Sequence, residues 1–220
     1  IQKIPKPVQN NHKLILIAVP LVTVIITYFL VSSMPDQYVS QTRMATGIVD
    51  NTDQMTGSRL VLQDMKADQE FDNVIQMMLL KKMVNQVSYK LIIHDLTSDT
   101  AFRKKSALVK ELNAAAVAHA VNTYQRKYAK MEDLSLWNND EKGLHKVLES
   151  MKYDYNSLIK NLRIYRVGKS DFITVEFESE NPVLSAFVAN TLTREFIAYY
   201  TNLVQASHAR SMIYLARMLK

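Results

Sequence analysis

Residues 170–200 read SDFITVEFESENPVLSAFVANTLTREFIAYY, which joins the pattern of a strand to the pattern of a helix. From 172 to 179 apolar and polar side chains alternate, as in an antiparallel strand with one buried face. Asn181 and Pro182 then supply an N-cap and a proline at the first helical position. Apolar residues follow at intervals of three and four: Leu184, Phe187, Val188, Leu192, Phe196, Tyr199 and Leu203.

The predicted helix meets no helix breaker between Pro182 and Lys220, a run of 39 residues. Such a helix is about 58 Å long and exceeds a compact domain of this size, so we expect it to project and to pack against a partner helix. Because the chain starts with Ile1 rather than Met and ends within the helical pattern, we expect it to be a fragment of a longer protein.

The segments before this stretch predict an α+β fold with a small sheet that contains antiparallel strands. Residues 162–167 form the expected partner strand, which turns through 168–170, and residues 37–49 form another strand. We expect a helix that Asp68 caps and that runs to Leu91 with a slip near Lys81. Two further helical segments are expected at 101–128 and 143–162. In the loop between them, residues 134–140, Trp137 is expected to make a minor packing contact.

An uncharged run at 14–31, LILIAVPLVTVIITYFLV, predicts a transmembrane helix. As a helix it spans about 27 Å, close to the hydrocarbon thickness of a bilayer, and Pro20 predicts a bend. Lys3, Lys6 and Lys13 precede the run, so the positive-inside rule puts the N-terminus in the cytoplasm. A cleaved signal peptide is the alternative, because residues 31–33 resemble a cleavage site.

Four parts are therefore expected along the chain. Residues 1–13 form a basic cytoplasmic arm and 14–31 the transmembrane helix. Residues 32–181 form an extracytoplasmic α/β base domain, and 182–220 form the start of the long projecting helix.

Composition excludes several classes of protein. The chain has no cysteine, which excludes disulfide frameworks and cysteine-ligated zinc, and its four glycines are isolated, which excludes a phosphate-binding loop. The net charge is +6, but three of the basic residues lie in the short N-terminal arm. Half of the excess therefore concerns membrane orientation, and we do not expect nucleic acid as a partner.

The sequence predicts no catalytic, cofactor-binding or metal-ligating residue. His94 and Asp95 form an isolated pair, and Glu176 and Glu178 lie on the polar face of the predicted strand, where solvation explains them. Acidic residues 171, 176, 178 and 180 are close enough in sequence to bind a cation weakly, without the spacing of a calcium loop. The densest basic patch, Arg103, Lys104, Lys105 and Lys110, is either a binding site for a phosphate-bearing lipid or an acidic glycan, or a solvated helix face, and the second is favoured. The residues alone favour a membrane-anchored assembly protein that is not an enzyme.

Several residues then carry a family resemblance. The stretch at 170–200 is the main local match, and a strand of the form Tyr38-x-Ser40 leaves the membrane helix. KKMVNQVSYKL at 81–91 is a second, weaker match, with Leu80 in place of a frequent serine. The chain resembles the chain-length determinant family, the Wzz-type polysaccharide co-polymerases, including the periplasmic region of Wzc- and GumC-like exopolysaccharide transport proteins and membrane tyrosine kinases. The motif positions are Tyr38, Ser40, Ser170, Asp171, Asn181, Pro182, Ala189 and Asn190.

The resemblance implies an inner-membrane scaffold of a bacterium, with the N-terminus in the cytoplasm and the main domain in the periplasm. Members form rings that regulate the chain length and export of a lipid-linked surface polysaccharide or exopolysaccharide. The implied partners are the bilayer, further copies of the chain, a polysaccharide polymerase and an outer-membrane export protein, without a cofactor. A tyrosine kinase domain, as some members carry, would lie outside these 220 residues.

Two other classes of function remain open from the sequence. The extracytoplasmic sensor region of a membrane receptor kinase has the same order of membrane helix, α/β domain and long exit helix. An enzyme acting on periplasmic glycans is less favoured, because no pair of carboxylates is placed in a predicted cleft.

Overall fold

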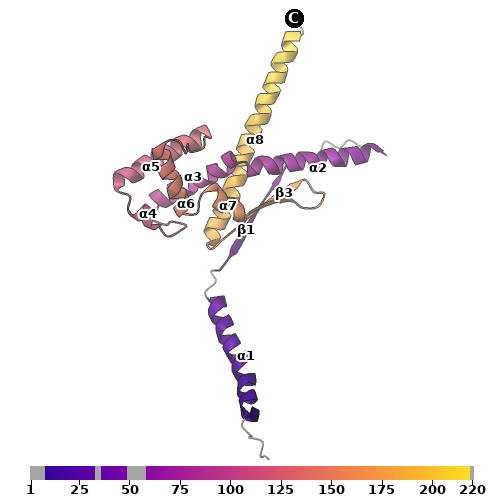
Figure 1. The fold of residues 1–220 in the computed structure, drawn as a ribbon. Helices are drawn as coiled ribbons and strands as arrows, with labels where there is room; N and C mark the ends of the chain where they lie inside the picture. The colour runs from indigo at the N-terminus through magenta and orange to yellow at the C-terminus, as the bar shows by residue number, and fades with distance from the viewer. Residues whose placement is uncertain (1–7, 33–35, 49–57, 219–220) are drawn as a thin grey trace, which may run out of the picture. The chain divides into compact units, whose positions relative to one another are not determined.

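A computed structural model of the chain describes residues 8–32, 36–48 and 58–218, and the chain divides into two units between Gln37 and Tyr38 (Figure 1). The first unit contains helix α1, Val8–Ser32. All remaining helices and strands belong to the second unit, which we call the base domain.

Helix α1 is long and apolar enough to cross a membrane. Its window Ile15–Ser32 has 18 residues with a mean hydropathy of 2.5, and none of it is buried against other parts of the chain. Length and composition of this kind are shared by membrane spans and by signal sequences near an N-terminus. The helix begins at Val8, six positions before the predicted start, so the second half of the expected basic arm is helical. Lys3 and Lys6 of that arm lie outside the described residues.

The base domain contains a three-stranded antiparallel sheet in the order β1-β3-β2. Its strands are β1, Tyr38–Ala45, β2, Leu162–Arg166, and β3, Phe172–Ser179. In the register, Tyr38 lies opposite Ser179, and Leu162 lies opposite Phe177. All three predicted strands are confirmed, although β1 ends four residues before the predicted limit and Val49 lies outside the described residues.

The predicted alternation along β3 is confirmed with one difference. Ile173, Val175 and Phe177 are buried on the inner face, and Glu176 and Glu178 are partly exposed on the other. Thr174 was expected on the solvated face, but its side chain is fully buried. The turn between β2 and β3 closes at 168–170 as expected, where Ser170 N–H donates to the carbonyl of Val167 at 3.2 Å.

Helix α8, Pro182–Met218, starts at the predicted residue and is 37 residues long. The Oδ1 of Asn181 accepts the N–H groups of Val183 at 2.9 Å and Leu184 at 3.4 Å, so the predicted N-cap is confirmed. The first half of α8 packs on β1, β3 and α3, and its second half extends away from the base domain (Figure 1).

The predicted helix at 68–91 is two helices, α2, Ser58–Leu79, and α3, Lys81–Thr97. The predicted N-cap at Asp68 is wrong, because this residue lies within α2 and its Oδ1 accepts Arg166 Nη1 at 2.6 Å. The slip in the apolar pattern near Lys81 marks the break, where Leu80 has an extended ψ of 139°.

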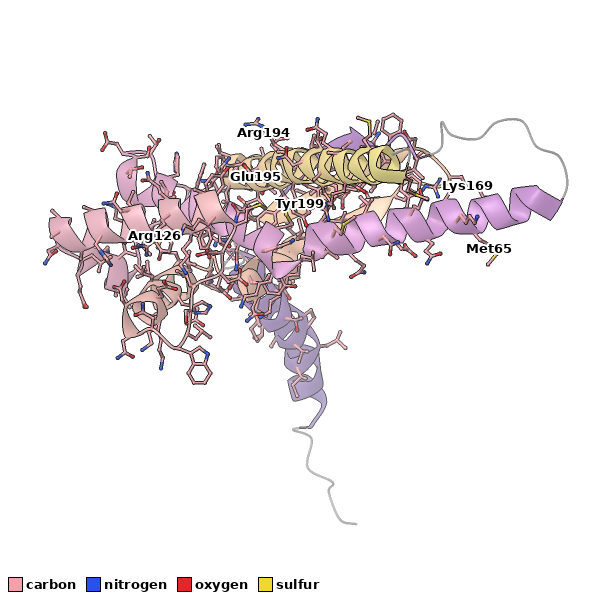
Figure 2. All side chains as sticks on the ribbon, turned by 90° about the horizontal axis from the view of Figure 1, so that it is seen from above. Met65, Arg126, Lys169, Arg194, Glu195 and Tyr199 are labelled. Carbon is pink, nitrogen blue, oxygen red and sulfur yellow. The ribbon has the colours of Figure 1, made fainter. Side chains whose placement is uncertain are left out.

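Helix α3 lies at the centre of the base domain and contacts α5, α7 and α8. Toward α8, Lys82 Nζ donates to the Tyr199 hydroxyl at 2.6 Å and Lys90 Nζ pairs with Glu195. Figure 2 shows Glu195 and Tyr199 on the side of α8 that faces α3, whereas Arg194 points to solvent.

Residues 101–128 do not form one helix as predicted. Helix α4, Ala107–Lys110, and helix α5, Ala114–Lys130, are preceded by a non-helical segment at 101–106. The carboxylate of Asp95 accepts the N–H groups of Phe102 at 2.9 Å and Arg103 at 3.3 Å. These bonds to a buried group of α3 replace the helical hydrogen bonds of that segment.

The predicted helix at 143–162 is also divided, into α6, Asn139–Ser150, and α7, Tyr155–Asn161. Lys152 between them adopts a left-handed backbone with φ of 56°, and Leu162 already belongs to β2. The expected packing contact of Trp137 is wrong, because this side chain is 98% exposed.

The packing of β3 generates a prediction about stability. Phe177 is 1% exposed on the inner face of β3, and Phe172 on the same strand is 48% exposed. Replacing Phe177 by alanine leaves a cavity in the core, so we expect a loss of about 3 to 5 kcal/mol in the free energy of unfolding. Chemical denaturation of the full chain in detergent measures this loss. The matched variant Phe172→Ala should change stability by less than about 1 kcal/mol, and equal losses would contradict the burial pattern.

Candidate functional site

One open cavity of about 550 Å³ forms where four segments of the base domain meet. These segments are the start of β1, the residues after α3, the end of α6 and the start of α8. The residues that line it are Tyr38, Phe102, Arg103, Lys104, Ser150, Met151, Lys152, Glu180, Asn181 and Pro182. Segments distant in sequence therefore create a basic site that spacing alone does not show.

The Arg103 guanidinium joins three of these segments. Its Nε and Nη2 donate to the two carboxylate oxygens of Glu180 at 2.6 and 3.2 Å. Its Nη1 donates to the backbone carbonyls of Met151 at 3.0 Å and Lys152 at 2.8 Å. The planar fork of arginine suits this bidentate pairing, so Arg103 fixes the walls of the cavity.

The charge of the cavity depends on which cations are already paired. The hydrogen bond from Arg103 lowers the pKa of Glu180 below its ordinary value, against the opposing effect of burial, so this carboxylate is ionised and compensates Arg103. The exposed ammonium groups of Lys104 and Lys152 have no hydrogen bond or ion pair within the described part of the chain. The charge of Lys152 also acts on the Glu180 carboxylate, without an ion pair, and the three basic residues and one acidic residue of the lining leave the cavity with a net positive charge.

Lys152 occupies a backbone conformation that disfavours a side chain. Its φ of 56° lies in the left-handed region, which costs an L-residue about 1 to 2 kcal/mol. The Lys152 N–H donates to Glu149 at 2.9 Å, while its carbonyl accepts Arg103. The lysine is thus held at a position that glycine would fill with less strain.

The structure brings three of the eight family-motif residues to this cavity: Tyr38, Asn181 and Pro182. The carbonyl of Tyr38 accepts the Ser185 hydroxyl at 2.8 Å, and Asn181 Nδ2 donates to the Phe102 carbonyl at 3.0 Å. These bonds tie the start of β1 and the segment 101–106 to the first turn of α8.

Two other motif residues, Ser170 and Asp171, lie at the opposite end of the sheet. The Asp171 carboxylate accepts the Thr46 hydroxyl at 2.6 Å and the N–H groups of Gly47 at 2.8 Å and Ile48 at 3.1 Å. Ser170 Oγ donates to the Val167 carbonyl at 2.6 Å. The pair closes the turn before β3 and secures the chain that leaves β1, where Gly47 has a φ of 71°.

The remaining motif residues lie along the contact between β1 and α8. Asn190 Oδ1 accepts the hydroxyl of Thr42 on β1, and Ala189 is fully buried. Ser40 belongs to the same half-buried face of β1, opposite Phe177. The observed contacts of the motif residues are therefore structural. Ser170 and Asp171 join the start of β3 to the end of β1, and the other motif residues lie at the start of α8 or where α8 and β3 meet β1.

The isolated pair of His94 and Asp95 also has a structural role. Asp95 is buried and accepts the Tyr153 hydroxyl at 2.6 Å, and His94 Nδ1 lies 3.1 Å from its other oxygen. The His94 ring stacks on Phe102 with 4.1 Å between ring centroids. Burial together with the bond to Asp95 raises the pKa of Tyr153, so this phenol remains protonated and donates.

Acidic residues of β3 do not assemble into a catalytic or cation site. Glu176 Oε1 accepts Gln41 Nε2 at 2.7 Å and the Tyr165 hydroxyl at 2.6 Å on the outer face of the sheet. Asp171 and Glu180 lie beyond opposite ends of the strand. Among the residues that the structure describes, no group of three or more metal-ligating side chains is found.

The favoured interpretation of the basic patch, a solvated helix face, is wrong for Arg103 and Lys104. Both lie in the non-helical segment and line the cavity, whereas Lys110 ends the short helix α4. Sequence reasoning missed Lys152, which belongs to no charge cluster or motif. It considered Glu180 only as a member of an acidic cluster and not as the partner of Arg103.

Comparisons of the chain with protein-family models, curated proteins and solved structures found no match. The function is therefore inferred from the residues and geometry described above.

The Arg103–Glu180 pair generates a pH prediction. Because the folded pKa of Glu180 lies below the unfolded value, its contribution to stability is complete above that unfolded value, 4.5, and is lost as the pH falls through the folded pKa. The pair is partly exposed, so Glu180→Gln should cost at most about 1 kcal/mol at pH 7. Denaturation at several pH values should show the parent and the variant converging as the pH falls below 4.5 and through the folded pKa of Glu180; a constant difference would contradict the pairing.

The left-handed backbone of Lys152 generates a prediction of increased stability. Lys152→Gly removes a left-handed penalty that exceeds the entropic cost of glycine, so the free energy of unfolding should rise by about 0.5 to 1 kcal/mol. Thermal or chemical denaturation of the full chain measures the change. The control Lys146→Gly, within α6, should lower stability by a similar amount. A destabilised Lys152→Gly protein would show that the side chain itself supports the fold.

Proposed function

We propose that the chain is part of a polysaccharide co-polymerase, a scaffold anchored in the inner membrane of a bacterium that assembles into rings. In this role it regulates the chain length and export of a lipid-linked surface polysaccharide or exopolysaccharide. The observation that carries the proposal is the second half of α8, whose described side chains are largely exposed.

Helix α8 has two halves with different surroundings. At 37 residues it is about 55 Å long. Leu184, Val188, Leu192 and Phe196 are buried in the base domain. From 201 to 210 every side chain is exposed except that of Val204, which is half-buried. A helix that exposes its side chains over several turns in this way is suited to pack against another helix.

The apolar residues of the exposed half support such a contact. Leu203 is 40% exposed and continues the face of Phe196, seven positions earlier and about two helical turns away. Met212 is 70% exposed on the same half. Neighbouring copies of the chain supply equivalent helices around a closed ring, which buries these residues without a further protein.

The membrane part of the proposal depends on α1 and on the lysines around it. Lys3, Lys6 and Lys13 precede the apolar run, and Asp36 is the first charged residue after it. This distribution favours a cytoplasmic N-terminus and a periplasmic base domain. The polymerase and the outer-membrane export protein enter as partners through the resemblance alone.

The cavity at Arg103 also fits the alternative function, the sensor region of a membrane receptor kinase, because a pocket of about 550 Å³ has the size of a small-molecule site. The two functions differ in what a deletion changes in cells. Loss of a co-polymerase shifts the modal length of a surface glycan on a gel. Loss of a receptor alters gene expression. When the polysaccharide genes are expressed from a constitutive promoter, its loss leaves the length distribution of the glycan unchanged.

Oligomerisation of the full chain tests the proposal directly. In detergent, light scattering should give a mass of several copies of the 25.2 kDa chain. Leu203→Asp puts a charge into the predicted helix contact and should weaken association about tenfold or more. Asn202→Asp, an equal change of charge at the adjacent exposed position, should leave the mass unchanged. A monomeric parent protein would overturn the ring assembly.

A further inference from the structure

We propose that the cavity between Tyr38, Lys104 and Lys152 binds the phosphate of an anionic lipid headgroup, so that the base domain itself contacts the bilayer surface. This inference rests on the membrane anchorage in the proposed function and is independent of ring assembly.

Charge complementarity is the first reason. Among the lining residues three are basic and one is acidic, and Arg103 and Glu180 compensate each other at 2.6 Å. The ammonium groups of Lys104 and Lys152 remain, and each carries a charge on a flexible stem that suits a phosphate in a fluid layer. A lysine near an anionic membrane surface contributes about 1 kcal/mol to the free energy of binding.

The position of Lys152 is the second reason. Its φ of 56° is that of a residue that caps the end of α6, where the N–H groups of Lys152 and Tyr153 donate to the carbonyls of Glu149 and Leu148, each at 2.9 Å. The Lys152 carbonyl accepts Arg103 Nη1 at 2.8 Å, so the cap and this bond fix the backbone of the lysine on the cavity wall.

The position of the cavity in the chain is the third reason. Tyr38 follows Ser32, the last residue of α1, by six positions, and six residues extend at most about 21 Å. In the base domain the first residues of β1 and of α8 lie at the same end, and Ser185 Oγ donates to the Tyr38 carbonyl at 2.8 Å (Figure 1). The covalent connection therefore limits the distance between Tyr38 and the end of a spanning α1 to about 21 Å.

The chemistry of the walls favours a lipid over free phosphate. Pro182 has no N–H, and the N–H groups of Val183 and Leu184 are used by the Asn181 cap. The start of α8 therefore offers no free amide cradle of the kind that binds soluble phosphates. Phe102 and Pro182 instead add apolar surface beside the two lysines, as suits a headgroup whose glycerol and acyl carbons lie next to its phosphate.

Binding of a short-chain lipid to the full chain tests this site. The protein in a non-ionic detergent is titrated with dioctanoyl phosphatidylglycerol and, in parallel, with dioctanoyl phosphatidylcholine and with inorganic phosphate, and retained lipid is read by native mass spectrometry. The double variant Lys104→Gln with Lys152→Gln should bind phosphatidylglycerol about 30-fold more weakly, from about 1 kcal/mol for each lysine. The control Lys142→Gln with Lys146→Gln removes two exposed lysines of α6 outside the cavity and should bind like the parent.

Each outcome decides for or against the site. Selective retention of phosphatidylglycerol that only the cavity variant loses supports the proposal. Equal binding by both double variants, equal retention of phosphatidylcholine, or full competition by millimolar inorganic phosphate overturns it.

Separate readouts isolate this inference from loss of folding and from the proposed function. Lys152→Gly should lose affinity about fivefold, from about 1 kcal/mol for one lysine, while retaining a cooperative unfolding transition, which separates binding from folding. Carbonate extraction of cell membranes reports anchorage through α1. Light scattering reports ring assembly. A loss of anchorage or of assembly is therefore distinguished from a loss of lipid binding at the cavity.

Discussion

A two-residue connection between the central strand and the longest helix constrains the rest of the base domain. β3 ends at Ser179 and α8 begins at Pro182, so Glu180 and Asn181 alone reverse the chain. The Ser179 and Ser185 hydroxyls lie 2.7 Å apart, and the Ser179 hydroxyl lies 2.8 Å from the Asn181 carbonyl. Buried hydroxyls without partners would be costly, so this cluster favours one direction of α8 across the sheet. β1 then joins the same cluster through the carbonyl of Tyr38.

The cavity is a consequence of this joint and of one buried carboxylate. Asp95 holds the segment 101–106 out of helical geometry, and Asn181 holds the Phe102 carbonyl from the other side. Arg103 is thereby presented to Glu180, which stands in the connection itself. The residues that define the fold at this end therefore also set the charge of the site, leaving the two lysines to face solvent.

Local patterns in the sequence identify elements whose stability is encoded within a few neighbouring residues. The alternation at 172–179 and the Asn181–Pro182 start act through periodicity and capping, and both elements are found where expected. The uncharged run acts through its length and hydropathy and lies within α1, which begins six residues earlier than expected. The errors arise where a residue distant in sequence forms the hydrogen bonds that the local pattern assigns to the helix. Asp68 resembles an N-cap, but the helix begins earlier and Arg166 uses its carboxylate. Residues 101–106 have helical composition, but Asp95 takes their N–H groups.

The same difference between local and distant contacts applies to the residues of the candidate site. Asn181 could be assigned from its place before a proline, because capping is local. Lys152 could not, since its place in the cavity depends on Arg103 and Glu180, which lie in segments distant in sequence.

The exposure of the second half of α8 also affects the stability of that helix. From 201 to 210 the side chains of α8 are exposed except that of Val204, and a helical stretch with so little burial is marginal in water. Thr201 and Asn202 are also modest helix formers. Packing between helices would supply the missing stability, so assembly would stabilise the projecting half as well as create the interface.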